Sequence, residues 1–190
     1  MSEIRVVIGV IGDDIHVVAN RILDIFLTGA GCTSPRCVYL IDGNKSQAQE
    51  MCQTLTDLWP DTIQQLPAPH TASSVVMASQ WGKSVGWDVQ LANNNSAVIA
   101  FGKKDTPIIQ SNMFLPISWT TLSERIKTLP HNIQTIGYET KKEMISNWME
   151  NLSETRVKRF VPLPEMHHFG PTWDGFSFWR QLFEEVEIRV

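Results

Sequence analysis

The stretch RVVIGVIGDDIHVVANRILDIF, residues 5–26, decides the fold class of this sequence. It opens with a β-branched run, Arg5 to Ile11, that a glycine closes, and such a run is typical of a buried strand. One of two aspartates, Asp13 or Asp14, can cap a following helix, whose apolar residues recur at helical spacing up to a stop at Gly29. A buried strand followed at once by an amphipathic helix predicts the first unit of a parallel α/β sheet.

The rest of the chain repeats this alternation. The Trp59–Pro60 pair is expected to break a helix, and asparagines at 93–95 predict the turn of a hairpin. We predict a single α/β domain over residues 1–190, with a mostly parallel sheet flanked by helices. Further strands are expected at 37–41, 89–92, 97–101, 114–118, 131–137 and 158–161, and further helices at 46–58, 74–86, 122–129, 142–152 and 176–186, with a loop at 162–175.

Composition excludes several classes of protein. With 43% hydrophobic and 19% charged residues in 190, the chain is globular rather than disordered. The net charge of -4 and the lack of a basic cluster argue against nucleic-acid binding. No apolar run approaches the roughly 20 residues of a membrane span, and no signal peptide is evident. We expect a soluble, cytoplasmic protein with three reduced cysteines.

Cys32 is the candidate nucleophile. A thiolate attacks thioester and aldehyde carbonyls well. Glycines precede Cys32, while Thr33 and Ser34 follow it, so that a substrate carbonyl can approach backbone amides that stabilise the oxyanion. A buried structural role is the alternative for any cysteine near a strand start. Of the other thiols, Cys52 falls on the apolar face of a predicted helix, and Cys37 opens a predicted strand.

Three segments carry a family resemblance: 24–40, with Gly31-Cys32-Thr33-Ser34-Pro35-Arg36 at its centre, 133–137, and 159–175, which contains Glu165-Met166-His167 and Trp173-Asp174-Gly175. Together they resemble the catalytic half of acyl-CoA reductases and Lux-type fatty-acid reductases, in the aldehyde-dehydrogenase superfamily. The resemblance implies an aldehyde-dehydrogenase-like catalytic domain in an oligomeric protein. It further implies that Cys32 accepts the acyl group of an acyl-CoA or acyl-protein thioester, with Thr33 and Ser34 at the oxyanion, and that NADPH reduces the acyl-cysteine to an aldehyde.

In these reductases a nucleotide-binding domain precedes the cysteine, whereas Met1 lies only about thirty residues before Cys32. The family's cofactor site and general base are therefore expected outside this chain, for example on a nucleotide-binding partner subunit. The sequence has neither a G-x-G-x-x-G fingerprint nor a P-loop. No residue is assigned to the cofactor, and the isolated chain is expected to bind NADPH poorly.

Two alternatives remain from the residues themselves. The segment around Asp14 and His16 resembles the Asp-x-His-x-x-Gly loop of cobalamin-binding mutase subunits, with Ala19 in place of the glycine. A non-catalytic remnant acting through subunit contacts is the other alternative. The aromatic residues of 176–186 form a stripe at helical spacing that predicts a protein contact.

The C-terminal loop also contains a cluster of metal-ligand residue types. Adjacent His167 and His168, with Glu165 and Asp174, lie within ten residues of one another. Neighbouring histidines tend to point apart, whereas a metal site needs three or four convergent ligands. We expect no metal at this loop.

Overall fold

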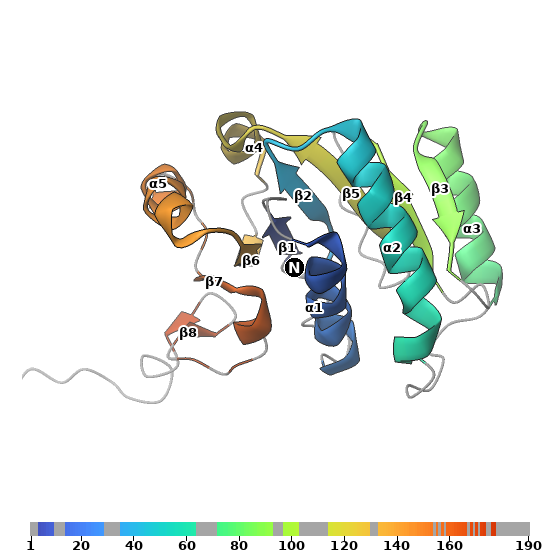
Figure 1. Ribbon diagram of the computed structural model, residues 1–190, viewed down its shortest axis with the longest axis horizontal. Coiled ribbons are helices and arrows are strands. Elements are labelled where there is room, and N and C mark those ends of the chain that lie inside the picture. Colours follow the sequence, from blue (N-terminus) through green and yellow to red (C-terminus); the bar gives the residue numbers. More distant parts are fainter. Residues whose placement is uncertain are drawn as a thin grey trace, which may run out of the picture.

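The described part of the chain forms a seven-stranded sheet with the order β3-β4-β5-β2-β1-β6-β7 and a separate two-stranded hairpin, β8-β9. All neighbouring strands of the large sheet run parallel except β3 and β4. Figure 1 shows this sheet with its helices. The strands are β1 (Ile4–Gly9), β2 (Val38–Ile41), β3 (Asp88–Leu91), β4 (Val98–Phe101), β5 (Phe114–Thr120), β6 (Ile133–Glu139), β7 (Arg159–Pro162), β8 (Thr172–Trp173) and β9 (Phe176–Ser177).

The computed structural model describes residues 4–9, 14–28, 35–63, 72–92, 97–102, 114–129, 133–153, 155, 157, 159–166, 168, 170, 172–173 and 176–177. Its helices are α1 (Ile15–Thr28), α2 (Lys45–Ile63), α3 (Ala72–Ser84), α4 (Leu122–Thr128), α5 (Lys142–Ser153) and the short 3₁₀ turn η2 (Leu163–Glu165). None of these helices combines the length and the apolar composition that a membrane crossing requires. The predicted α/β class with a mostly parallel sheet is confirmed.

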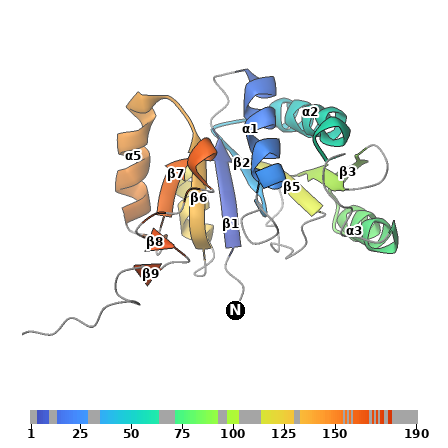
Figure 2. The same cartoon turned by 90° about the horizontal axis from the view of Figure 1, so that it is seen from below.

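Strand β2 divides the core into two faces. Val38 and Leu40 belong to a cluster with apolar residues of α1 and α2. Tyr39 and Ile41 point the other way and join residues of α4 and α5. A third cluster packs α3 against β4 and β5. Figure 2 shows α1 and α2 on one side of the sheet and α3 on the other. Because both faces are covered, all four residues of β2 are buried, as in a typical parallel sheet.

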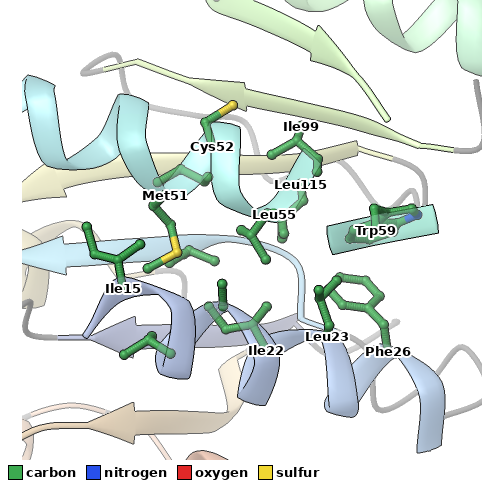
Figure 3. Close-up of a cluster of buried hydrophobic side chains, with 14 of the residues drawn as sticks. Ile15, Ile22, Leu23, Phe26, Met51, Cys52, Leu55, Trp59, Ile99 and Leu115 are labelled. Carbon is green, nitrogen blue, oxygen red and sulfur yellow. The ribbon is translucent and has the colours of Figure 1, made fainter. Parts of the chain in front are cut away.

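The largest apolar cluster lies between α1, α2 and the sheet (Figure 3). Ile22 and Leu23 of α1 face Met51 and Leu55 of α2, and each of these side chains is at most 1% exposed. Near the ends of the two helices, the rings of Phe26 and Trp59 lie 4.9 Å apart. Burial of a large apolar side chain stabilises by about 1.5–3 kcal/mol, so this contact fixes α1 and α2 as one layer.

Polar side chains define where helices begin. Asp14 caps α1, since its carboxylate accepts the backbone N–H of His16 at 2.9 Å. Asn44 and Gln47 bond reciprocally at the start of α2, at 3.0 and 3.1 Å. Such a capping box satisfies backbone donors that the helix itself leaves unpaired. The predicted Asp cap is thus confirmed at Asp14, while Asp13 and Gly29 lie outside the described residues.

Two prolines leave intact a helix and a strand that the sequence predicts to be shorter. Helix α2 continues through Pro60 to Ile63 instead of breaking at Trp59–Pro60. A proline removes one N–H donor near the end of a helix, and the buried Trp59 ring beside it still anchors that turn. Strand β5 likewise continues through Pro116 to Thr120, two residues beyond the predicted end, because the remaining residues still pair with β4 and β2.

The C-terminal prediction of a helix at 176–186 is wrong at its start. Phe176 and Ser177 form β9, which pairs antiparallel with Thr172 and Trp173 of β8. Residues 178–186, with the rest of the predicted aromatic stripe, lie outside the described residues. Local helical spacing is overridden here by the backbone pairing of a short hairpin.

After β7, the chain turns back against the sheet through η2. Leu163 and Met166 are fully buried in the cluster that α1 and α2 form. They cover Gly137 in β6 so closely that a Cβ added there would overlap the Met166 side chain. A glycine is needed at this position for close packing rather than for an unusual backbone conformation.

We expect Gly137→Ala to lower the free energy of unfolding by about 1–3 kcal/mol, because the added methyl overpacks the contact with Met166. Urea unfolding of the parent and the variant measures this change. The same substitution made in a Met166→Ala background should cost clearly less, since the overlapping side chain is gone. An equal cost in both backgrounds would contradict the packing explanation.

Candidate functional site

The three predicted catalytic positions, Cys32, Thr33 and Ser34, lie outside the described residues. Their flanking segments are described. Helix α1 returns from the carboxyl end of β1 and ends at Thr28, and Pro35 is buried just before β2 begins. Since β1 and β2 are parallel, both flanks lie at the amino-terminal edge of the sheet.

Cys37, the competing thiol, is a core residue. It is 1% exposed and belongs to the cluster beneath α4 and α5. Burial raises the pKa of the Cys37 thiol to about 11, with Tyr39 and Arg125 acting in the opposite direction. Arg125 itself is buried with its guanidinium carbon 3.8 Å from the centre of the Tyr39 ring. A thiol in this environment stays protonated near neutral pH and is a poor nucleophile.

Cys52 is equally unsuited to attack a substrate. Cys52 lies on the face of α2 that packs against the sheet, and its side chain is fully buried (Figure 3). Desolvation raises the pKa of Cys52 to about 12; Thr56 lowers the pKa and Asp88 raises it further. The Thr56 hydroxyl also donates to the Cys52 carbonyl at 2.7 Å. Both predictions of buried, structural roles for Cys37 and Cys52 are confirmed.

The C-terminal signature segments meet in one contact. The Arg159 guanidinium donates to three carbonyl oxygens, of Glu165 at 2.8 Å, Met166 at 2.9 Å and His168 at 2.7 Å. Desolvation lowers the pKa of Arg159, while Glu165 opposes that shift. We call these four residues the Arg159 clamp. Sequence reasoning identified the segment as a signature but missed the interaction, because backbone acceptors leave no pattern in the sequence.

The clamp and the glycine contact act together. Met166 is held by its carbonyl at Arg159 and by its side chain over Gly137. Thus Gly137 of β6 and the turn with Leu163 and Met166 form one packed contact on the face that α1 covers.

The cobalamin alternative rests on His16 and Asp14. His16 is exposed in the first turn of α1, and the Asp14 carboxylate is occupied as the helix cap. Asn20 donates to the His16 carbonyl at 2.9 Å. The arrangement is that of an ordinary helix start, and nothing in it favours a cobalt ligand.

The predicted metal-ligand residue types do not converge where they are described. Among the described residues, no group of three or more His, Cys, Asp and Glu side chains comes together. Glu165 and His168 are exposed, and His167 and Asp174 lie outside the described residues.

An open hollow of about 400 Å³ lies at the opposite, carboxyl-terminal edge of the sheet. Its one ion pair joins Lys45 and Asp88 at 3.9 Å, with both side chains more than 60% exposed. Exposed ion pairs of this kind contribute little to the free energy of folding. The Asp88 carboxylate beside Lys45 also disfavours binding of a phosphate group in the hollow. The hollow is lined by Lys45, Gln49, Asp88, Val89, Gln90 and Phe101.

The described residues do not fit a nicotinamide dinucleotide. Such a cofactor is held by a glycine-rich turn at a helix N-terminus that faces its pyrophosphate. The start of α1 presents the Asp14 carboxylate, and the start of α2 is closed by the Asn44–Gln47 capping box. No reaction step is therefore assigned to a cofactor held by these residues.

No protein-family model matches the chain, and no curated protein sequence does. Solved structures match its fold. An oxidoreductase from Marinobacter aquaeolei is 12% identical over 90% of this chain and 40% of its own, with a TM-score of 0.60. The delta-pyrroline-5-carboxylate dehydrogenase from Mycobacterium tuberculosis is 11% identical over 85% of this chain and 35% of its own, with a TM-score of 0.62.

A third similar structure is an NAD-dependent benzaldehyde dehydrogenase from Corynebacterium glutamicum, 10% identical over 85% of this chain and 39% of its own, with a TM-score of 0.57. The chain thus spans between 35% and 40% of the length of these three structures. One of these structures is of an oxidoreductase and two are of dehydrogenases, and the fold of this chain is aldehyde-dehydrogenase-like.

Iodoacetamide at pH 8 is expected to leave Cys37 and Cys52 unmodified in the folded protein. Their pKa values, raised to about 11 and about 12, leave about one thiolate in a thousand or fewer at this pH, and burial blocks access. Peptide mass spectrometry measures the modification, and the same treatment in urea should label both residues. Labelling of either thiol in folded protein at the rate seen in urea would contradict its buried position.

Proposed function

We propose that this chain supplies the acyl-accepting cysteine of an acyl-CoA reductase. The observation that carries the proposal is the assignment of Cys37 and Cys52 to the core of an aldehyde-dehydrogenase-like fold. Cys32 is the remaining thiol of the three, and it lies in the segment that resembles the active site of these reductases. The described residues that flank it in the sequence, Thr28 at the end of α1 and Pro35 before β2, lie at the amino-terminal edge of the sheet.

In the proposed first step, the Cys32 thiolate attacks the carbonyl carbon of an acyl-CoA or acyl-protein thioester. The carbonyl oxygen takes up negative charge, and the backbone N–H groups of Thr33 and Ser34 donate hydrogen bonds to it. Collapse of this intermediate breaks the bond from the carbonyl carbon to the original sulfur. The leaving thiolate takes a proton from solvent, so the step is thioester exchange with no change of oxidation state.

The complete proposed activity converts the acyl-cysteine to an aldehyde with NADPH as the reductant. A nicotinamide supplies hydride for such two-electron reductions, and one similar structure is of an enzyme described as NAD-dependent. No residue of this chain is assigned to the nicotinamide. We propose that a nucleotide-binding partner subunit holds it.

The decisive experiment exposes the protein to a long-chain acyl-CoA without a nicotinamide. We expect one acyl group on the Cys32 peptide and release of one equivalent of CoA thiol, because exchange needs only a nucleophilic thiolate. Intact and peptide-level mass spectrometry measure the acyl group, and a thiol reagent measures free CoA. Cys32→Ala should abolish both signals.

Matched controls are Cys37→Ala and Cys52→Ala, which remove the two buried thiols. Both variants should retain acylation at Cys32 wherever they fold, as judged by circular dichroism. Acylation that persists unchanged in Cys32→Ala would remove the catalytic assignment, and the chain would then be a non-catalytic structural relative of these reductases.

A further inference from the structure

We propose that the outer edge of strand β3 is a dimerisation surface, on which a second copy of this chain adds its own β3 as an antiparallel strand. Strand β3 stands at one end of the order of the large sheet and, among the described strands, pairs with β4 alone. Figure 1 shows β3 and α3 together at this end of the sheet. The edge of a sheet is a ready template for a further strand. The proposal does not depend on the function proposed for Cys32.

The main chain of β3 presents a definite set of hydrogen-bonding groups at this edge. The Ala92 amide donates to the Ala97 carbonyl at 3.0 Å, so the main chain of Ala92 faces β4. Because this direction alternates along an antiparallel strand, the main chain of Gln90 also faces β4. The N–H and C=O groups of Val89 and Leu91 therefore face outward, where a further strand can bond to them.

Exposed apolar side chains gather beside the same edge. Five large apolar residues are exposed in the described part of the chain, and three of them lie here, Val76 and Met77 on α3 and Leu91 on β3. Trp81 of α3 packs on Phe114 of β5, with ring centres 5.5 Å apart. Val76 lies about 140° around the helix from Trp81, on the flank turned away from the centre of the sheet. Apolar surface that gathers in this way is typical of a protein interface.

The side chains of β3 alternate in a way that is complementary to a second β3. Gln90 faces the α2 side, where the Thr56 hydroxyl donates to its side chain at 3.1 Å, and Asp88 shares that side by alternation. Val89 packs in the cluster on the α3 side, and Leu91 shares that side. In an antiparallel pair of two β3 strands centred on Gln90, polar side chains meet on one face and apolar side chains on the other.

This register also satisfies the outward main-chain groups without bringing like charges together. Val89 of each copy lies opposite Leu91 of the other, so their N–H and C=O groups bond reciprocally. Asp88 lies opposite Ala92 of the second copy, which keeps the two Asp88 residues about 14 Å apart along the strands. Because both partners carry the same alternation, the match is built into the sequence of β3, and it favours a second copy over an unrelated strand.

Sedimentation equilibrium of the full chain tests the surface. We expect a reversible monomer–dimer equilibrium with a micromolar Kd, since pairing along one edge buries less area than a standard interface. Leu91→Lys should raise this Kd by about tenfold or more, because each dimer loses two apolar contacts and desolvates two ammonium groups. Met149→Lys, which changes an exposed apolar residue of α5 instead, should match the parent within about twofold.

Introduced cysteines test the register in a Cys32→Ala background, where the remaining native thiols, Cys37 and Cys52, are buried. Gln90→Cys places the two new thiols directly opposite each other at a non-hydrogen-bonded pair, where side chains approach closely. Mild oxidation should therefore give a disulfide-linked dimer of this variant. Asp88→Cys is the matched control on the same strand and face, and its thiols lie too far apart to be bridged.

Circular dichroism reports whether each variant is folded, and Val76→Lys tests the same surface if Leu91→Lys does not fold. A parent that stays monomeric across the micromolar range would overturn the inference. A dimer that folded Leu91→Lys or Val76→Lys leaves unchanged would overturn it as well, since dimerisation would then use another surface. Oxidative crosslinking through Asp88→Cys but not through Gln90→Cys would contradict the proposed pairing. None of these measurements involves acylation, so their outcome is separate from that of the proposed function.

Discussion

The burial of β2 on both faces is the constraint on which the rest of this structure depends. Val38 and Leu40 face the layer of α1 and α2, while Tyr39 and Ile41 face α4 and α5. A shift by one residue would exchange the two sets between layers. The register of β2 with β1 and β5 is therefore fixed, and with it the point at the amino-terminal edge where the connection from α1 must arrive.

The same constraint explains why Cys37 is interpreted as a core residue, whereas Cys32, five residues earlier in the sequence, is not. Cys37 continues the alternation of β2 and is drawn into the face that Arg125 and Tyr39 share. Its raised pKa is a consequence of that desolvation. Cys32 precedes the strand in the sequence and lies outside the described residues. Chemistry that needs a thiolate is incompatible with the buried position of Cys37.

Most of the parallel sheet could be predicted because β-branched runs and helical spacing are local signals. The prolines show the limit of local reasoning, since Pro60 and Pro116 each remove one donor while neighbouring contacts keep α2 and β5 intact. The predicted start of the C-terminal helix was wrong because Phe176 pairs with Trp173. This pairing depends on a reversal of the chain between them, which helical spacing does not reveal. At the candidate site, Cys37 and Cys52 were placed correctly from periodicity. The Arg159 clamp could not be predicted, because carbonyl acceptors belong to every residue.

A comparison of the two arginine contacts shows which of them constrains the fold more strongly. The ion pair of Arg21 and Glu139 involves an arginine side chain that is 40% exposed, and exposed pairs contribute at most about 1 kcal/mol. Hydrogen bonds to charged groups contribute about 1.5–3 kcal/mol each where solvent is excluded, and Arg159 makes three to one segment. Partial exposure reduces that figure, but the clamp also closes over the buried Met166. The Arg159 clamp therefore constrains the fold more strongly than the ion pair of Arg21 and Glu139. Helix α1 covers the turn that the clamp holds.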